Sequence, residues 1–277
     1  MLELNKIHQG DCMELMQHIP DKSVDMILCD LPYGTTACKW DKVLPLNELW
    51  KQYKRILKKD GVVVLTASQP FTTDLINSNR DWFKYEMIWD KKCITSPALA
   101  QVQPLRTHEN ILVFYNKAGK YNPLKITPKN TIGYMGKEKE YGNHKVWGYK
   151  QMRSKNQDNE LGYPRSIISI RRKINLDKKT AFDVDETHPT EKPIELFKLL
   201  IKLFSNEGEL VLDNCIGSGT TAVACKQTNR NFIGIELNPN YVDICNKRLK
   251  QKTMFEIAEK RDTLNSYMEV SADSSQP

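Results

Sequence analysis

The sequence predicts an α/β fold, a doubly wound and mainly parallel sheet with helices on both faces. Two observations support this prediction. The runs VDMILC and GVVVL place apolar residues on both faces of a strand, as is typical of parallel strands buried on both faces. Segments with apolar residues at helical spacing separate such runs along most of the chain. The 277 residues, 40% of them hydrophobic, suffice for one large domain with a smaller insert, or for two domains.

The first half of the chain is expected to supply strands and helices in alternation. The segment LNELWKQYKRIL has the apolar spacing of a helix, and GVVVLTAS has the composition of a buried strand. In order we expect a strand at 6–10, a helix at 12–19, a strand at 24–30, a helix at 46–57, a strand at 61–68 and a helix at 71–78. The stretches YEMIWDK and NILVFYNK then predict a pair of strands.

The second half resumes this alternation after a long irregular stretch. The segment PIELFKLLIKLF predicts a helix at 193–204. A strand, loop and helix are expected within 211–227, and a further strand and helix within 232–249. We see no internal repeat.

Residues 117–185 interrupt the pattern and concentrate positive charge. They hold 16 Lys and Arg against 7 Asp and Glu, whereas the whole chain has a net charge of +7. A loop of this length is either functional or a solvated linker. Interleaved aromatic residues argue against the linker, since disordered segments are poor in them; they are Tyr134, Tyr141, Trp147, Tyr149 and Tyr163. We therefore expect a small ordered unit that contacts nucleic acid between a first half at 1–116 and a second at 186–251, with a disordered tail at 252–277.

The composition also bears on location and cofactors. The start of the chain lacks the pattern of a secretory signal, and no apolar run approaches the length of a membrane span. The seven cysteines are scattered and never form a CxxC pair, so we expect neither disulfides nor a metal site. The sequence thus predicts a soluble, cytoplasmic protein without contact to membranes.

A glycine loop in VLDNCIGSGTTAVAC predicts a ligand site. A strand runs into Asp213, Gly217 and Gly219 follow, and Thr220 is placed to begin a helix. Glycines let the backbone approach a ligand closely, and a helix start offers unpaired N–H groups. Glu236 ends the next strand, where a carboxylate can accept hydrogen bonds from both hydroxyls of a ribose. The arrangement suits a cofactor that contains adenosine.

Two other interpretations of this loop remain open. A bare GxG is usually a packing turn. Gly217, Gly219 and Ala222 also satisfy the GxGxxA pattern of dinucleotide binders. A dinucleotide fold, however, continues through further strands, and only about 28 mostly polar residues follow Leu249. No lysine follows Gly219, which excludes a P-loop.

The N-terminal strand can fill the missing place beside FIGIE, and this would bring Asp11 near the adenine of the cofactor. The strand that ends at Asp30 would then lie beside the strand that ends at Asp213. Open α/β sheets bind ligands at the carboxyl ends of strands where the strand order reverses. We therefore expect the residues of DLPY to face the cofactor across one crevice; they are Asp30, Leu31, Pro32 and Tyr33.

DLPY followed by DNCIGSGTT resembles the DNA amino-methyltransferases that use S-adenosylmethionine, in the permuted order with the catalytic motif first. HPTEKPIEL and FIGIELNPNYVDICNKRL are similar to further cofactor elements of that family, and the basic insert occupies the place of its target-recognition region. The resemblance covers most of residues 1–250. It implies a seven-stranded Rossmann-like methyltransferase sheet, and leaves a bacterial or a phage origin open.

The resemblance also implies roles for individual residues. The enzyme extracts the target base from the duplex. Tyr33 stacks on this base, while the Asp30 carboxylate and the Leu31 carbonyl accept the amino hydrogens. The implied cofactor contacts are Asp11, Thr190, Lys192, Asp213, Gly217, Ser218, Gly219, Thr220 and Glu236, and the better candidates for phosphate contacts are Arg171, Arg172 and Lys173.

An aspartate at the first catalytic position favours N6 of adenine, whereas serine is commoner among enzymes that methylate N4 of cytosine. The chain departs from the family at Leu31, usually proline, and at Asn214 and Cys215, where proline and phenylalanine are commoner. HPTEKP also reads as a helix start that Thr190 could cap. N4-cytosine methylation, an RNA or protein acceptor, a nicotinamide-dependent oxidoreductase and a DNA-binding module without activity remain alternatives.

Overall fold

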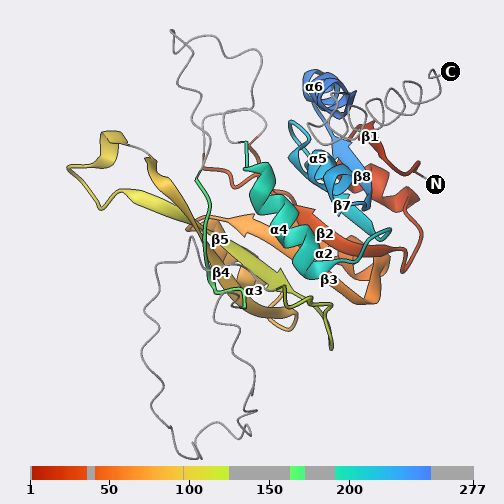
Figure 1. Cartoon of the computed structure of the whole chain (residues 1–277), viewed down its shortest axis with the longest axis horizontal. Helices are drawn as coiled ribbons and strands as arrows, with labels where there is room; N and C mark the ends of the chain where they lie inside the picture. The colour runs from red at the N-terminus through yellow and green to blue at the C-terminus, as the bar shows by residue number, and fades with distance from the viewer. Residues whose placement is uncertain (1, 36–40, 96, 125–162, 172–190, 251–277) are drawn as a thin grey trace, which may run out of the picture.

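The computed structural model describes residues 2–35, 41–95, 97–124, 163–171 and 191–250 (Figure 1). A single sheet of eight strands, in the order β1-β8-β7-β2-β3-β5-β4-β6, forms its centre. The strands are β1 (Lys6–Gln9), β2 (Val24–Cys29), β3 (Leu57–Ala67), β4 (Phe83–Thr95), β5 (Arg106–Phe114), β6 (Ile167–Ser169), β7 (Leu210–Asp213) and β8 (Asn231–Glu236). The first five strands in spatial order run parallel, and β5 is antiparallel to both β3 and β4. The predicted α/β class and the predicted pair of strands are confirmed.

Helices cover both faces of the sheet, as predicted. On one face α1 (Cys12–Leu15), α2 (Leu46–Ile56) and α3 (Phe71–Ser78) pack against one apolar core. On the other face α4 (Ile194–Phe204), α5 (Thr220–Gln227) and α6 (Pro239–Lys250) pack against a second core. Every residue of β2 is buried: its apolar side chains enter the two cores, and the Asp25 carboxylate pairs with Lys58. Short 3₁₀ turns at Met16–His18 and Pro97–Leu99 complete the elements of the described chain.

The eighth strand comes from the region that we expected to be a separate insert. β6 lies within 117–185 and pairs in parallel with the edge strand β4. Ile168 is buried, and the Trp89 indole donates a hydrogen bond of 2.9 Å to the carbonyl of Ile170. The apolar SIISI segment therefore extends the sheet beyond the seven strands that the resemblance implied. The rest of the expected insert, except 117–124 and 163–171, lies outside the described residues, as does the tail at 252–277.

The strand order places the predicted ligand residues at one edge of the sheet. β1 lies beside β8, with His8 opposite Ile235, and β2 lies beside β7, with Ile27 opposite Leu212. From this central pair the chain proceeds to β3 on one side and to β8 on the other. The carboxyl ends of β2 and β7 thus flank a topological switch point, where open α/β sheets bind ligands. Within the described residues no helix has the length and apolar character of a membrane span.

Candidate active site

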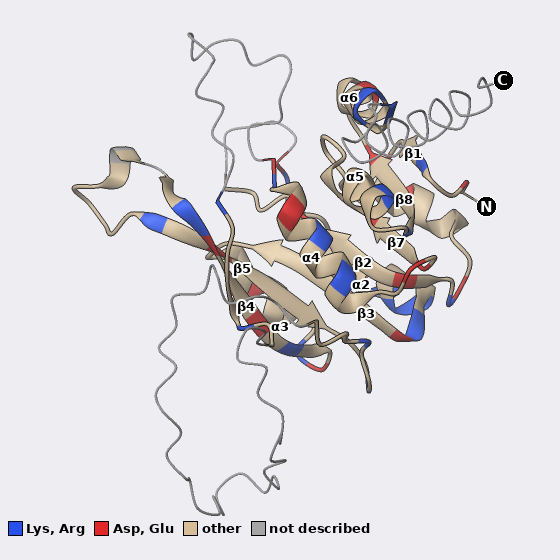
Figure 2. Cartoon of the chain, in the orientation of Figure 1, with Lys and Arg blue, Asp and Glu red and all other residues tan. Residues whose placement is uncertain are grey.

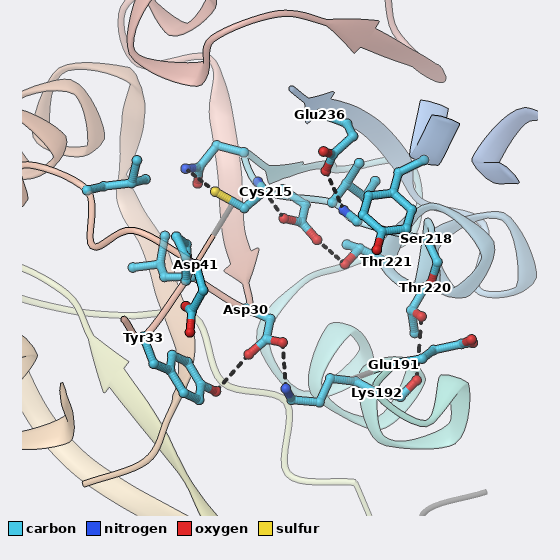
Figure 3. A pocket seen from close by; sticks show the side chains of 18 of the residues that line it. Asp30, Tyr33, Asp41, Glu191, Lys192, Cys215, Ser218, Thr220, Thr221 and Glu236 are labelled. Atoms are coloured by element: carbon cyan, nitrogen blue, oxygen red, sulfur yellow. Dashed lines mark hydrogen bonds and ion pairs between the residues drawn. The ribbon is translucent and has the colours of Figure 1, made fainter. Parts of the chain in front are cut away.

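A cavity of about 580 Å³ opens at the carboxyl ends of β2, β7 and β8 (Figure 3). Its volume is within the range of small-molecule sites. Residues of DLPY and of the glycine loop line the same cavity, although more than 180 positions separate Asp30 from Gly217 in the chain. The expected convergence of these two segments is therefore present in the structure.

Three donors hold the Asp30 carboxylate at the end of β2. The Tyr33 hydroxyl donates to Oδ1 at 2.7 Å, and the Thr66 hydroxyl donates to the same oxygen. The Lys192 ammonium donates to Oδ2 at 2.5 Å. The carboxylate is thus fixed in orientation while it still lines the cavity.

The Tyr33 ring lies beside this carboxylate and stacks on Phe71, with ring centroids 5.3 Å apart and planes inclined by 22°. Burial and the negative charge of Asp30 raise the pKa of Tyr33, so the phenol stays protonated and remains a donor. Pro32 and the buried Leu31 also line the cavity. All four residues of the predicted catalytic motif therefore meet at one place.

Two charged residues at this end of the cavity were missed by the sequence analysis. Lys91 on β4 is buried, and its ammonium lies 3.2 Å from Glu109 Oε1 on β5. The other carboxylate oxygen of Glu109 lies 3.4 Å from the Lys192 ammonium. Neither residue stands out in the sequence, because both strands carry several other charged or polar side chains.

At the other end of the cavity Asp213 shapes the start of the glycine loop. Its carboxylate accepts hydrogen bonds from the Thr221 hydroxyl and, at 3.1 Å, from the Cys215 N–H. Burial raises the pKa of Asp213 to about 7, although these hydrogen bonds oppose the shift. Asp213 lines the cavity, and its two partners belong to the loop and to α5.

Glu236 closes the loop from the end of β8. Its Oε2 accepts from the Gly217 N–H at 2.9 Å and its Oε1 accepts from the Asn238 N–H at 2.8 Å. Burial raises the pKa of this half-buried carboxyl, while the backbone donors lower it. Because each carboxylate oxygen has two acceptor positions, one on each oxygen remains for a ligand.

Backbone conformation and close packing both explain why glycine occupies these positions of the loop. Gly217 and Gly219 have φ of 53° and 88°, in the left-handed region that favours glycine. A Cβ on Gly219 would lie 2.8 Å from Cys245 Sγ on α6. Gly219 therefore allows close packing of α5 against α6, so the packing role that a bare GxG suggests is present at this position.

Residues before α4 connect the loop to the catalytic end. The Thr220 hydroxyl, at the start of α5, lies 3.4 Å from the Lys192 carbonyl. Arg248 donates to the carbonyl and hydroxyl of Ser218 at 2.7 and 2.9 Å, and to Glu191 at 2.6 Å. The backbone of Lys192 thus contacts the residue that follows the glycine loop, and its side chain contacts Asp30.

The remaining predicted site residues are dispersed. Asp11 lines the cavity and caps α1, accepting the Met13 N–H at 2.7 Å. Arg171 is exposed and follows β6. Thr190, Arg172 and Lys173 lie outside the described residues.

A DNA methylase family model, that of the N6 and N4 methyltransferases, matches residues 24–247, which include both ends of the cavity. The chain belongs to this family. Type II methyltransferase M1.MboII of Moraxella bovis is 30% identical over 268 residues, which cover 91% of this chain and 98% of the relative. DNA adenine methyltransferase YhdJ of Escherichia coli K12 is 28% identical over 273 residues, which cover 89% and 83% of the two chains.

Solved structures of methyltransferases share the fold of this family member. A crystal structure of an M1.HpyAVI–SAM complex aligns with a TM-score of 0.60 at 24% identity, over 89% of this chain and 99% of that one. The PvuII DNA methyltransferase, which is cytosine-N4-specific, aligns with a TM-score of 0.62 at 16% identity, over 91% and 88%. At these identities the likeness establishes the fold.

Proposed function

We propose that this DNA methyltransferase transfers the methyl group of S-adenosylmethionine to N6 of adenine within a specific DNA site. The observation that carries the proposal is the shared cavity, in which Asp30 with Tyr33 occupies one end and the glycine loop with Glu236 the other. An amino-methyltransferase must bind the amino group and the methyl donor next to each other. This cavity can bind the amino group at one end and the methyl donor at the other.

The residues at the loop end fit S-adenosylmethionine. Glu236 retains acceptor positions for two ribose hydroxyls, while Ile216 and Leu237 supply apolar surface for an adenine ring. Carboxylates at the cavity wall suit the positive sulfonium, which supplies an activated methyl group. Asp11, Ser218 and Thr220 complete this end of the site; Thr190 belongs to the same proposal through the resemblance alone.

At the catalytic end the chain binds and orients the amino group. The extruded base stacks on Tyr33, whose ring Phe71 holds in place. Asp30 accepts one amino hydrogen and the Leu31 carbonyl accepts the other. These hydrogen bonds strengthen as positive charge develops on the nitrogen, so they stabilise the transition state more than the bound substrate. A strong base is not required, because the methylated nitrogen loses its proton readily.

Adenine is favoured over cytosine by the aspartate at position 30 and by the similarity to YhdJ, a DNA adenine methyltransferase. The test is to incubate duplex DNA with methyl-labelled cofactor and to digest the product to nucleosides. We expect the label in N6-methyl-2′-deoxyadenosine. Label in N4-methylcytosine alone would reject the adenine assignment, and transfer to RNA or protein alone would reject DNA as the substrate.

Substitution of the catalytic carboxylate tests the mechanism. Asp30→Asn keeps the shape of the side chain but removes the charge that stabilises the developing cation. We expect the single-turnover rate to fall about 100-fold or more, with equilibrium binding of DNA and cofactor largely retained. Unchanged transfer in Asp30→Asn would contradict the assignment of this residue.

A further inference from the structure

We propose that Lys192 is a positioning residue for the Asp30 carboxylate, whose orientation it fixes, and that its side chain does not bind the cofactor. The inference deepens the proposed function, on which it rests. It also changes the role that the sequence resemblance implied for this lysine. Figure 3 shows the Lys192 side chain extending from the segment just before α4 to Asp30.

The ammonium of Lys192 is already bound on two sides. Only 7% of its side chain is exposed, and its nitrogen lies 2.5 Å from Asp30 Oδ2 and 3.4 Å from Glu109 Oε2. That Glu109 oxygen is buried and has no hydrogen-bond partner among the described residues, so its interaction with Lys192 is electrostatic. Two carboxylates therefore already occupy this ammonium.

The charges alternate along one wall of the cavity. Lys91 pairs with one oxygen of Glu109, Lys192 pairs with the other, and Lys192 also pairs with Asp30. Removing one member leaves a buried neighbour without compensation, which is more costly than losing a surface ion pair. Lys192 thus separates two carboxylates that would otherwise repel each other.

The titration of Lys192 is consistent with a permanent cation. Burial lowers its pKa, but the negative charges of Asp30 and Glu109, with the hydrogen bond to Asp30, outweigh this effect and raise it overall. At neutral pH the side chain is therefore an ammonium, which donates hydrogen bonds and cannot accept the proton that the amino group loses.

The hydrogen bonds around Asp30 explain why its orientation matters. A carboxylate has about four acceptor positions. Tyr33, Thr66 and Lys192 occupy three of them. The remaining position suits one amino hydrogen of the target base, which matches the single bond that the proposed mechanism assigns to Asp30. Lys192 acts through Asp30 and touches neither reactant.

The test compares Lys192→Met, Lys192→Arg and the control Lys198→Met. Lys198 lies on α4, outside the cavity lining, and pairs with the exposed Glu195. In Lys192→Met we expect the single-turnover rate of methyl transfer to fall about 100-fold or more at neutral pH. The dissociation constant for S-adenosylmethionine, measured by calorimetry, should stay within about twofold of the wild-type value. Lys192→Arg should restore part of the rate, and Lys198→Met should match the wild type.

The pH–rate profile separates positioning from a merely structural role. The acid limb should move to higher pH in Lys192→Met, because no ammonium offsets the repulsion between two carboxylates. Glu109→Gln should move it to lower pH, because a negative neighbour of Asp30 is lost. Titratable or charged groups that line this cavity near Asp30 are Tyr33, Asp41, Lys91, Arg106, Glu109, Lys192 and Asp213, and the buried Cys29 thiol precedes Asp30 on β2. Asp213 is present in every variant. A shift of the acid limb relative to the wild type therefore measures the effect of replacing Lys192 or Glu109.

The outcomes are distinguishable from those of the proposed function. If the wild type methylates no DNA, the proposed function fails. If it does, loss of cofactor binding with an unchanged transfer step in Lys192→Met overturns this inference, and so does a rate loss with an unmoved acid limb. Should Lys192→Met fail to fold, the opposite shift expected for Glu109→Gln and the retained acid limb of Lys192→Arg decide the question.

Discussion

Two aspartates at the ends of neighbouring strands have different environments and so different chemistry. Asp30 is paired with a lysine and bonded by two hydroxyls. Asp213 is buried without a cationic partner at hydrogen-bond distance among the described residues, and burial raises its pKa to about 7. One carboxyl is thus suited to stabilise positive charge, while the other holds a proton over most of the acidic range.

The proton on Asp213 predicts a pH-dependent contribution to stability. The folded protein keeps it up to about pH 7, whereas an unfolded chain releases it near the ordinary aspartate pKa of 3.8. Between these values the native state binds more protons, so this group lowers the free energy of unfolding as the pH rises. The total is about 4 kcal/mol at most, from 1.4 kcal/mol per pKa unit.

Asp213→Asn removes this titration. We expect the free energy of unfolding of the variant, relative to the wild type, to increase between pH 4 and pH 8. Urea unfolding at several pH values measures the difference, and the loss of one acceptor for Thr221 or Cys215 adds only a constant offset. A difference independent of pH would show that Asp213 is already ionised in the acidic range.

Among the elements, the loop between β7 and α5 depends most on its glycines. Gly219→Ala places a residue at φ 88° and a Cβ 2.8 Å from Cys245 Sγ. Gly208→Ala is a matched control, because Gly208 has φ 77° and no atom within 4 Å of such a Cβ. The control isolates the backbone cost of about 1–2 kcal/mol.

We expect Gly219→Ala to destabilise the protein by about 1–3 kcal/mol more than Gly208→Ala, because α5 and α6 must separate. It should also weaken S-adenosylmethionine binding, since the loop lines the cavity. Guanidinium unfolding and calorimetric titration give the two values. Equal destabilisation by both substitutions would mean that the contact with Cys245 relaxes without cost.

The sequence predicted most elements because their signals are local. The buried runs of β2 and β3, the helical spacing of α2 and α4, and the glycine loop are each contained in a short window. β6 has only three residues, and its assignment depends on pairing with a distant strand. The local pattern of an apolar SIISI segment does not contain that information.

The candidate site was predictable where a motif marks it. The convergence of Asp30 and the glycine loop follows from the strand order. Glu109 and Lys91 carry no motif, and their roles depend on which side chains face the cavity in the folded sheet. The sequence likewise does not reveal that the Lys192 side chain pairs with Asp30.

For the molecule as a whole, the distribution of charge favours one end of the sheet for contact with DNA. This is the end where β4, β5 and β6 meet. Figure 2 shows basic residues on both strands of the β4–β5 hairpin where it projects beyond the other strands. Ile170 N–H bonds to the Asp90 carbonyl, so the chain continues alongside β4 toward the exposed Arg171. We propose this end as the side that meets the phosphates of DNA.

Salt dependence tests this proposal. Combined replacement of Arg171, Arg172 and Lys173 by alanine should reduce the slope of log binding constant against log salt by up to about 3, nearly one per lost phosphate contact. A matched control replaces Lys6, Lys247 and Lys250 by alanine. Lys6 is on the opposite edge strand β1, and the other two lysines are on α6. Equal changes in both triple variants would place the DNA contacts elsewhere.

The position of β7 between β2 and β8 has a consequence for biosynthesis. While the ribosome is still adding the residues before 210, β2 has emerged with one hydrogen-bonding edge unoccupied, and its largely apolar sequence favours association with other chains. Neighbours so distant in the chain are slow to find each other. We therefore expect a truncated product that ends before β7 to aggregate more readily than the full-length chain.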